Sequence, residues 1–187
     1  MKTATLESKF PLLAVENGCI ISKDADITAA YRVELPELFT LTRTEYEAIH
    51  STWAKAVKVL PNYSIVHKQD FFVEESYKPE ICKDDLSFLS RSFERHFNER
   101  PYLQHTCYLF LTKTTREHSR PPSSFNALTR GFIIPREMQA KETVTRFFDS
   151  CGQFERNVND SGLLRHTRLT EEELTGTATQ NGLTETY

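Results

Sequence analysis

The chain has 187 residues, of which 39% are hydrophobic and 26% are charged, and its formal net charge is −3. This length supports one sizeable core, and the charge gives no overall attraction to nucleic acid or acidic membranes. No apolar run approaches the ~20 residues that span a bilayer, and the apolar patch at residues 10–15 is too short for a signal peptide. We therefore expect a cytosolic protein.

The four cysteines are widely separated in the chain and include no CxxC pair. They are Cys19, Cys82, Cys107 and Cys151. Three of them lie in apolar surroundings, which favours buried, reduced thiols over disulfides or zinc ligands.

The N-terminal part is expected to be a flexible tail (residues 1–9) followed by a β-hairpin. Its two arms, residues 19–22 and 27–35, flank a polar turn. The second arm alternates apolar and polar side chains and ends at Pro36, and residues 38–41 are a candidate for a further short strand.

A helix is predicted over residues 44–59, with capping boxes possible at Thr42 with Glu45 or at Thr44 with Glu47. Its apolar face consists of Tyr46, Ile49, Trp53, Ala56 and Leu60. A long strand with a polar middle follows over residues 63–73.

The central prediction concerns residues 84–114. Leu86, Leu89, Phe93 and Phe97 recur at helical spacing, so we expect a helix that begins at Asp84 or Asp85, ends before Pro101 and buries this face. Residues 105–114 form the most continuously apolar run and are expected to be a strand buried on both faces. Together the two would make the core of the fold.

The C-terminal half is expected to begin with an irregular loop. A short strand is predicted at residues 131–135, a helix at 141–158, a strand at 163–169 and a short helix from Thr170. Phe147, Phe148, Cys151 and Phe154 belong to the apolar face of the long helix. We expect one domain over residues 10–175 and a linker over residues 176–187.

This pattern favours an α+β fold, a two-layer sandwich in which a mixed or mostly antiparallel sheet carries about three helices, mainly on one face. A doubly wound parallel sheet is the alternative.

The sequence contains no catalytic or nucleotide-binding motif of the common kinds. GxxxxGK[ST], GxGxxG, HExxH, GxSxG and the EF-hand loop are all absent. His67 and Asp70 would point to opposite faces of a strand, and Cys107 lies in an apolar strand that would keep its thiol protonated. We therefore expect no catalytic, metal or cofactor site in this chain.

Two histidines flank Pro101 and could be imagined to bind a metal. They are His96 and His105, with Glu94 and Glu99 nearby. Because Arg95 is spaced to form an i,i+4 ion pair with Glu99, a solvated helix face is the better interpretation.

One segment, residues 113–141, is basic, with six lysines and arginines against two glutamates. Such a run is most often solvated surface, but it could dock an acidic partner, lipid headgroups or nucleic acid. The candidate interaction residues are Lys113, Arg116, Arg120, Arg130 and Arg136.

Several long segments resemble a known family. They are PLLAVENGCIISKDADITAAYRVELPELFTLTRTEYEAIH, DDLSFLSRSFERHFNERPYLQHTCYLFLTKTT, RGFIIP and NDSGLLRHTRLTEEELTG. They are similar to the N-terminal region of the TraG proteins of Bacteroidetes conjugative transposons, large ATPases that resemble the VirB-type ATPases of type IV secretion. The resemblance covers nearly the whole chain from about Phe10.

The resemblance implies a non-catalytic assembly and interaction domain, cytoplasmic and peripheral at the inner membrane through its partners. The expected partners are other subunits of the conjugation apparatus, among them an inner-membrane component, with self-association of the full-length protein. ATP and magnesium are expected only in a downstream motor domain, since the family's nucleotide-binding residues match no position here. A small stand-alone enzyme with an unrecognised site and a nucleic-acid-binding adaptor are the alternatives.

Overall fold

The computed structural model describes residues 10–77, 87–114 and 141–186. The described residues form two compact units, one of residues 10–68, 108–114 and 141–186 and one of residues 69–77 and 87–107. Strands β4 (Ser64–Ser76) and β5 (Pro101–Lys113) contribute residues to both units. The expected strand at residues 131–135 lies outside the described residues, as do the expected tail and the residues 78–86.

The fold is α+β with an antiparallel sheet, as the sequence predicted. The strand order is β1-β2-β3-β5-β4, and β6 also pairs with β3. The remaining strands of this sheet are β1 (Leu12–Glu16), β2 (Cys19–Ser22), β3 (Ile27–Glu34) and β6 (Arg165–Arg168). Because β2 pairs with the first residues of β3 and β6 with the last, the two share one edge of β3 in succession.

The N-terminal strands form two consecutive tight hairpins. Asn17 and Gly18, between β1 and β2, both have positive φ angles, as a two-residue hairpin turn requires. The Asn-Gly dipeptide is a strong hairpin signal, yet our sequence analysis did not predict β1. In the second turn, which it did predict, the Ser22 hydroxyl accepts hydrogen bonds from the backbone N–H groups of Asp24 and Asp26.

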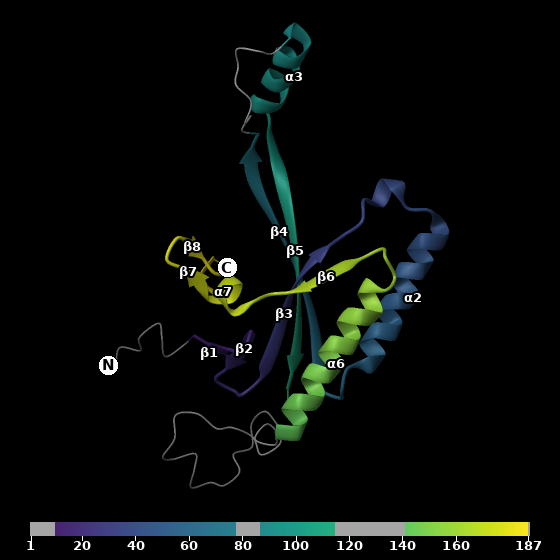
Figure 1. Cartoon of the computed structure of the whole chain (residues 1–187), viewed down its shortest axis with the longest axis vertical. Helices are drawn as coiled ribbons and strands as arrows, with labels where there is room; N and C mark the ends of the chain where they lie inside the picture. The colour runs from purple at the N-terminus through teal and green to yellow at the C-terminus, as the bar shows by residue number, and fades with distance from the viewer. Residues whose placement is uncertain (1–9, 78–86, 115–140, 187) are drawn as a thin grey trace, which may run out of the picture. The chain divides into compact units, whose positions relative to one another are not determined.

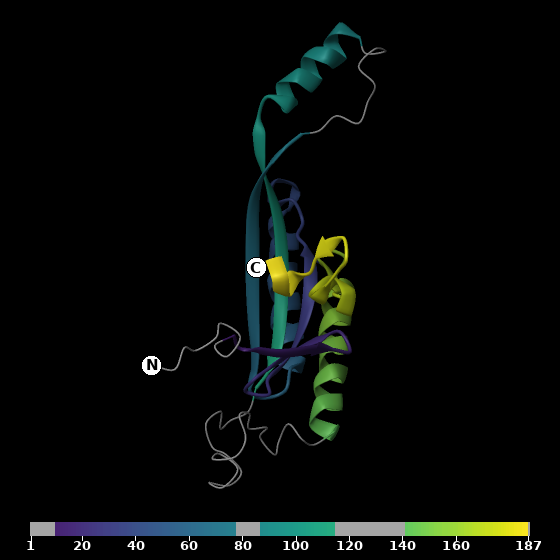
Figure 2. The same cartoon turned by 90° about the vertical axis from the view of Figure 1, so that its left-hand side faces the viewer.

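Two long helices, α2 (Arg43–Val59) and α6 (Lys141–Asn159), lie side by side against one face of the sheet (Figures 1 and 2). Helix α2 begins with the capping box of Thr42 and Glu45, the first of the two boxes in the sequence. Residues 38–40 form a short 3-10 helix, η1 (Leu38–Thr40), so the prediction of a strand there was wrong. The backbone N–H and the side-chain hydroxyl of Thr40 both donate to the Glu37 carbonyl, which closes this turn.

The core of the first unit lies between these helices and the sheet. Most of its large, fully buried side chains come from β3, β5 and α6, namely Tyr31, Leu109, Leu111, Phe147, Cys151, Phe154 and Val158. The predicted apolar face of α6 is therefore confirmed, and so is the buried strand over the second half of β5. Trp53 of α2 joins this core with its ring edge-on to Phe154, at a centroid distance of 5.7 Å.

The C-terminal residues are folded beyond the expected end of the domain. Helix α7 (Glu171–Thr175) is followed by the paired strands β7 (Gly176–Thr177) and β8 (Gln180–Asn181), and then by α8 (Leu183–Thr186). Leu174 is fully buried, and added Cβ atoms on Gly176 or Gly182 would overlap neighbouring backbone. Residues 176–182 therefore form a closely packed turn, which we name the C-terminal turn, where we expected a linker.

No helix in the described ranges combines the length and the apolar character that crossing a bilayer requires.

Candidate interaction surfaces

The predicted basic site is only partly described. Arg116, Arg120, Arg130 and Arg136 lie outside the described residues, and Lys113 is buried, with 4% of its surface exposed. The Lys113 ammonium donates hydrogen bonds to the carbonyl oxygens of Asn62 and Thr114 and lies 5.7 Å from the centre of the Tyr63 ring. The expectation that Lys113 contacts a partner was wrong, because carbonyl groups inside the fold already bind its charge.

Helix α3 (Phe88–Asn98) provides a surface that the sequence analysis assigned to the core. Leu89, Phe93 and Phe97 lie on one face at helical spacing, but 79% of Leu89 and 66% of Phe93 are exposed, and no residue of α3 is buried. The sequence analysis predicted the helical period correctly, but its prediction that these side chains are buried was wrong. We name Leu89, Phe93 and Phe97 the α3 stripe.

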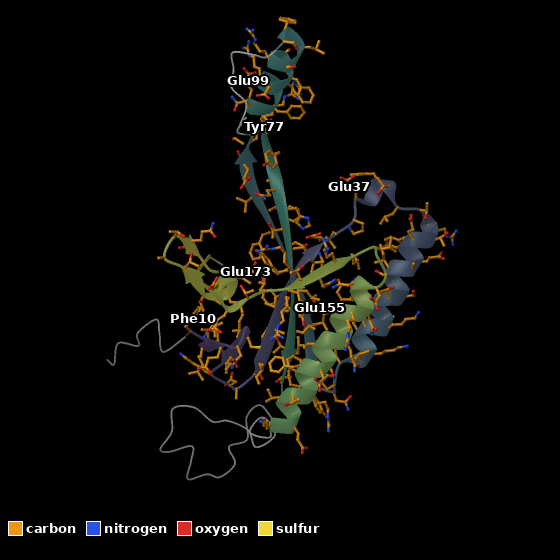
Figure 3. The ribbon with its side chains drawn as sticks, in the orientation of Figure 1. Phe10, Glu37, Tyr77, Glu99, Glu155 and Glu173 are labelled. Atoms are coloured by element: carbon orange, nitrogen blue, oxygen red, sulfur yellow. The ribbon has the colours of Figure 1, made fainter. Side chains whose placement is uncertain are left out.

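The ends of α3 are fixed by local hydrogen bonds. The Ser87 hydroxyl accepts from the Ser90 N–H and caps the helix, whereas the sequence analysis placed the cap at Asp84 or Asp85, outside the described residues. At the other end Arg95 donates to Glu99 at 2.8 Å, which lowers the pKa of that carboxyl group (Glu99 is labelled in Figure 3). The predicted solvated ion pair is confirmed, and the Ser87 cap and this pair stabilise α3, which has no buried residue.

Aromatic contacts continue from the stripe to the neighbouring strand. The rings of Phe93 and Phe97 lie 4.6 Å apart, and Tyr77, which follows β4, meets Phe97 edge-on at 6.3 Å. Such pairs give the exposed rings a fixed arrangement without removing them from solvent.

The strands of the second unit are linked by polar side chains. Asp70 of β4 is hydrogen-bonded to His105 of β5 at 2.9 Å, and the His105 ring stacks on Phe72 at 4.6 Å. Tyr102 donates to Glu75 at 3.2 Å, and this bond raises the Tyr102 pKa. The sequence analysis considered His105 and Asp70 separately and missed their pairing, because the register of two strands 35 residues apart is not visible in the sequence.

The described part of the second unit has almost no buried side chains. Among its described residues, 69–77 and 87–107, only Cys107 is buried. Several large apolar side chains of this unit are exposed, namely Phe72, Val73, Tyr77, Phe88, Leu89, Phe93, Phe97, Tyr102 and Leu103. Concentrated apolar exposure of this kind is typical of interaction surfaces.

A polar pocket of about 390 Å³ lies in the first unit. It is lined by Arg32, Tyr108 and residues of the C-terminal turn, among them Gln180 and Asn181. Arg32 donates to Glu173 of α7 at 3.2 Å, with both side chains partly exposed (Glu173 is labelled in Figure 3). This pair links α7 to the sheet.

Within the described ranges, no group of histidine, cysteine and carboxylate side chains could hold a metal ion.

Two buried cysteines, Cys19 of β2 and Cys151 of α6, contact polar side chains. Arg168 donates to the Cys19 sulfur at 3.1 Å and stacks over the Phe148 ring at 5.1 Å, while Tyr31 is hydrogen-bonded to Cys151. Burial raises the pKa of the Cys151 thiol to about 12 and also raises that of Cys19, against the opposing effect of Arg168. Both thiols stay protonated at neutral pH, and the expectation of free, buried cysteines is confirmed for Cys19, Cys107 and Cys151.

Comparison with known proteins gives one family match. Residues 1–51 match the family described as "Domain of unknown function, B. Theta Gene description (DUF3875)". The matched part contains β1, β2, β3, η1 and the first half of α2. No curated protein matches the chain.

Proposed function

We propose that the chain is a non-catalytic assembly domain of a conjugative transfer ATPase, which docks the motor on the transfer apparatus. The observation that carries the proposal is the α3 stripe, an apolar helix face that is exposed on a unit whose described residues include only one that is buried, Cys107. The resemblance to the N-terminal region of TraG proteins supplies the context. In this proposal the protein is cytoplasmic and peripheral at the inner membrane.

The partner that fits the α3 stripe is an apolar groove or helix of another apparatus subunit. An amphipathic helix presents anchors at i, i+4 and i+8 to such a groove, and Leu89, Phe93 and Phe97 have this spacing. The aromatic anchors are residues of the type that dominate binding energy in protein interfaces. The Ser87 cap and the Arg95–Glu99 ion pair stabilise the helix before binding, which reduces the ordering cost.

The proposal assigns the chain no reaction and no cofactor. ATP binding in the related motors needs a ring of backbone amides, a lysine on the phosphates and a hydroxyl on magnesium, at a spacing this sequence does not contain. We therefore expect calorimetry to detect no ATP binding, with or without magnesium. Saturable micromolar binding would contradict the proposal.

The decisive experiment is a pull-down of the 187-residue chain against the other subunits of the transfer apparatus. The variant Leu89→Ser/Phe93→Ser should lose the captured subunit while keeping its urea unfolding midpoint, because both side chains are exposed. Tyr46→Ser on α2 is the matched control, since Tyr46 is also a large exposed side chain on a helix, in the other unit.

Overproduction in a donor cell provides an independent readout. The chain should compete with the full-length protein for the shared subunit and lower the frequency of DNA transfer, and the α3 double variant should not. If the chain is folded and abundant but transfer is unchanged, the proposed docking role is wrong.

A further inference from the structure

Phe39 lies almost entirely outside the fold. It belongs to η1, and 97% of its surface is exposed, which is the largest exposed fraction among the large apolar side chains that the structure describes. The turn around it is closed, since the Thr40 N–H and hydroxyl donate to the Glu37 carbonyl at 3.1 Å and 2.9 Å, and Thr42 caps the helix that follows. A phenylalanine held outward on such a turn is a preformed anchor for another surface.

A cavity of about 580 Å³ opens beside the segment that leads to this turn. Its apolar lining comes from Leu35 and Pro36, which follow β3, and from Leu163 and Leu164, which precede β6. Both segments lie at the end of the first unit where α2 begins and α6 ends (Figure 1). A cavity of about 150 Å³ is enough to hold a benzene ring, so this one, which we name the β3–β6 cavity, has room for a phenylalanine side chain.

The β3–β6 cavity also carries one charged side chain of each sign. Glu34 and Arg165 line it, with their side chains 65% and 74% exposed and their charged groups 4.0 Å apart. A surface with both signs is complementary to a second copy of itself about a two-fold axis, because the carboxylate of each copy can face the guanidinium of the other. A surface of one sign would repel its copy.

We infer that two copies of this chain associate about a two-fold axis, with Phe39 of each copy inserted in the β3–β6 cavity of the other. The exposed ring and the cavity are separated by only a few residues of the same unit, so one symmetric contact buries both rings and fills both cavities. A partner of another kind, offering only a cavity or only a side chain, would use just one of the two features.

This inference goes beyond the proposed function, because it concerns contact between copies and uses Phe39 rather than the α3 stripe. If the chain is monomeric but still captures an apparatus subunit, only the association of copies is refuted. If it dimerises through Phe39 but captures nothing, only the docking role is refuted.

Sedimentation equilibrium of the 187-residue chain measures the association. The protein should form a species of twice its 21.7 kDa mass. Phe39→Ser removes both rings and Leu163→Arg blocks both cavities, so each change should weaken the dimer at least about a hundredfold. Phe10→Ser is the matched control and should leave the dimer intact, since Phe10 is also exposed but lies on the other side of this unit from Glu37 (both are labelled in Figure 3).

A mixture of the two variants distinguishes this contact from a general loss of folding. The Phe39→Ser chain keeps its cavity and the Leu163→Arg chain keeps its ring, so a mixed dimer regains one of the two contacts. The mixed dimer should therefore be about tenfold tighter than the dimer of either variant alone, because one of two equal contributions to the binding free energy returns. Two misfolded variants would show no such recovery.

Photo-cross-linking tests where the ring lies. With p-benzoyl-L-phenylalanine in place of Phe39, irradiation should link two copies, and mass spectrometry should find the link in residues 159–165 of the second copy. The same photoreactive residue in place of Phe10 is the control and should give no linked dimer.

Four results would overturn the inference. The first is a monomer at all accessible concentrations. The second is a dimer that Phe39→Ser leaves intact but Leu89→Ser/Phe93→Ser abolishes, which would assign the contact to the α3 stripe. The third is a mixed dimer no tighter than those of the single variants. The fourth is a link from residue 39 to residues 159–165 at the mass of one chain, which would mean that Phe39 fills the cavity of its own copy.

Discussion

The burial of His166 predicts a specific loss of stability in mild acid. This side chain is 2% exposed, and its two ring nitrogens have no hydrogen-bond partner among the described residues. The rings of Trp53 and Phe154 meet it edge-on at 5.7 Å and 6.0 Å, so α2 and α6 both surround it. Burial without a polar partner disfavours the charged form and lowers the pKa of His166 from 6.5 to about 4.

The sign and size of the effect follow from proton linkage. Between pH 6.5 and pH 4 the unfolded chain binds a proton at His166 that the folded chain does not, so the free energy of unfolding falls as the pH falls. With these two pKa values the loss between pH 7 and pH 5 is about 2 kcal/mol. It is complete only below the folded pKa.

Urea unfolding of the full chain at pH 7, 6 and 5 measures this loss directly. The variant His166→Leu keeps an apolar side chain of similar size between the two rings and removes the titrating group. Its unfolding free energy should fall about 2 kcal/mol less than that of the original chain over the same range. Equal pH dependence in the two proteins would refute the reasoning, because it would mean that His166 has the same pKa in the folded and the unfolded chain.

Three further predictions concern packing. Phe154→Ala should lower the free energy of unfolding by ~3–5 kcal/mol, because the ring is fully buried, whereas Phe93→Ala should change it by less than ~0.5 kcal/mol; equal urea midpoints would contradict the difference in burial. Asn159→Ala should cost ~1–3 kcal/mol in the same assay, because it removes both hydrogen bonds to the His166 backbone, and a neutral result would mean that water replaces them. Gly182→Ala should loosen the C-terminal turn, because the added methyl group overlaps the backbone of residues 174–176. The measurement is hydrogen exchange at the Leu174 amide, which should become faster, and unchanged exchange would contradict the close packing.

The sequence alone determined the local elements of this protein. The period of 3.6 residues predicted α2, α3 and α6, the capping residues at Thr42 and Thr170 were visible as motifs, and the apolar run at residues 105–114 predicted the buried half of β5. These features are local, since they depend on side chains within about four residues of one another. The Asn17-Gly18 turn was equally local, and its signal was available.

Only the tertiary structure decided which apolar faces are buried. Helices α3 and α6 both carry phenylalanines at helical spacing, yet Phe147 and Phe154 are fully buried while Phe93 is mostly exposed. The period of a pattern shows that a helix has an apolar face, but not whether another element covers it. Strand pairing, too, was decided only by the tertiary structure. It connects residues far apart in the chain and determines the bond of Asp70 to His105, the place of β4 at the end of the sheet and the burial of Lys113 against Asn62. These strand pairings form only when the chain brings distant segments together. For that reason the candidate surfaces can be identified in the folded protein but not in its sequence.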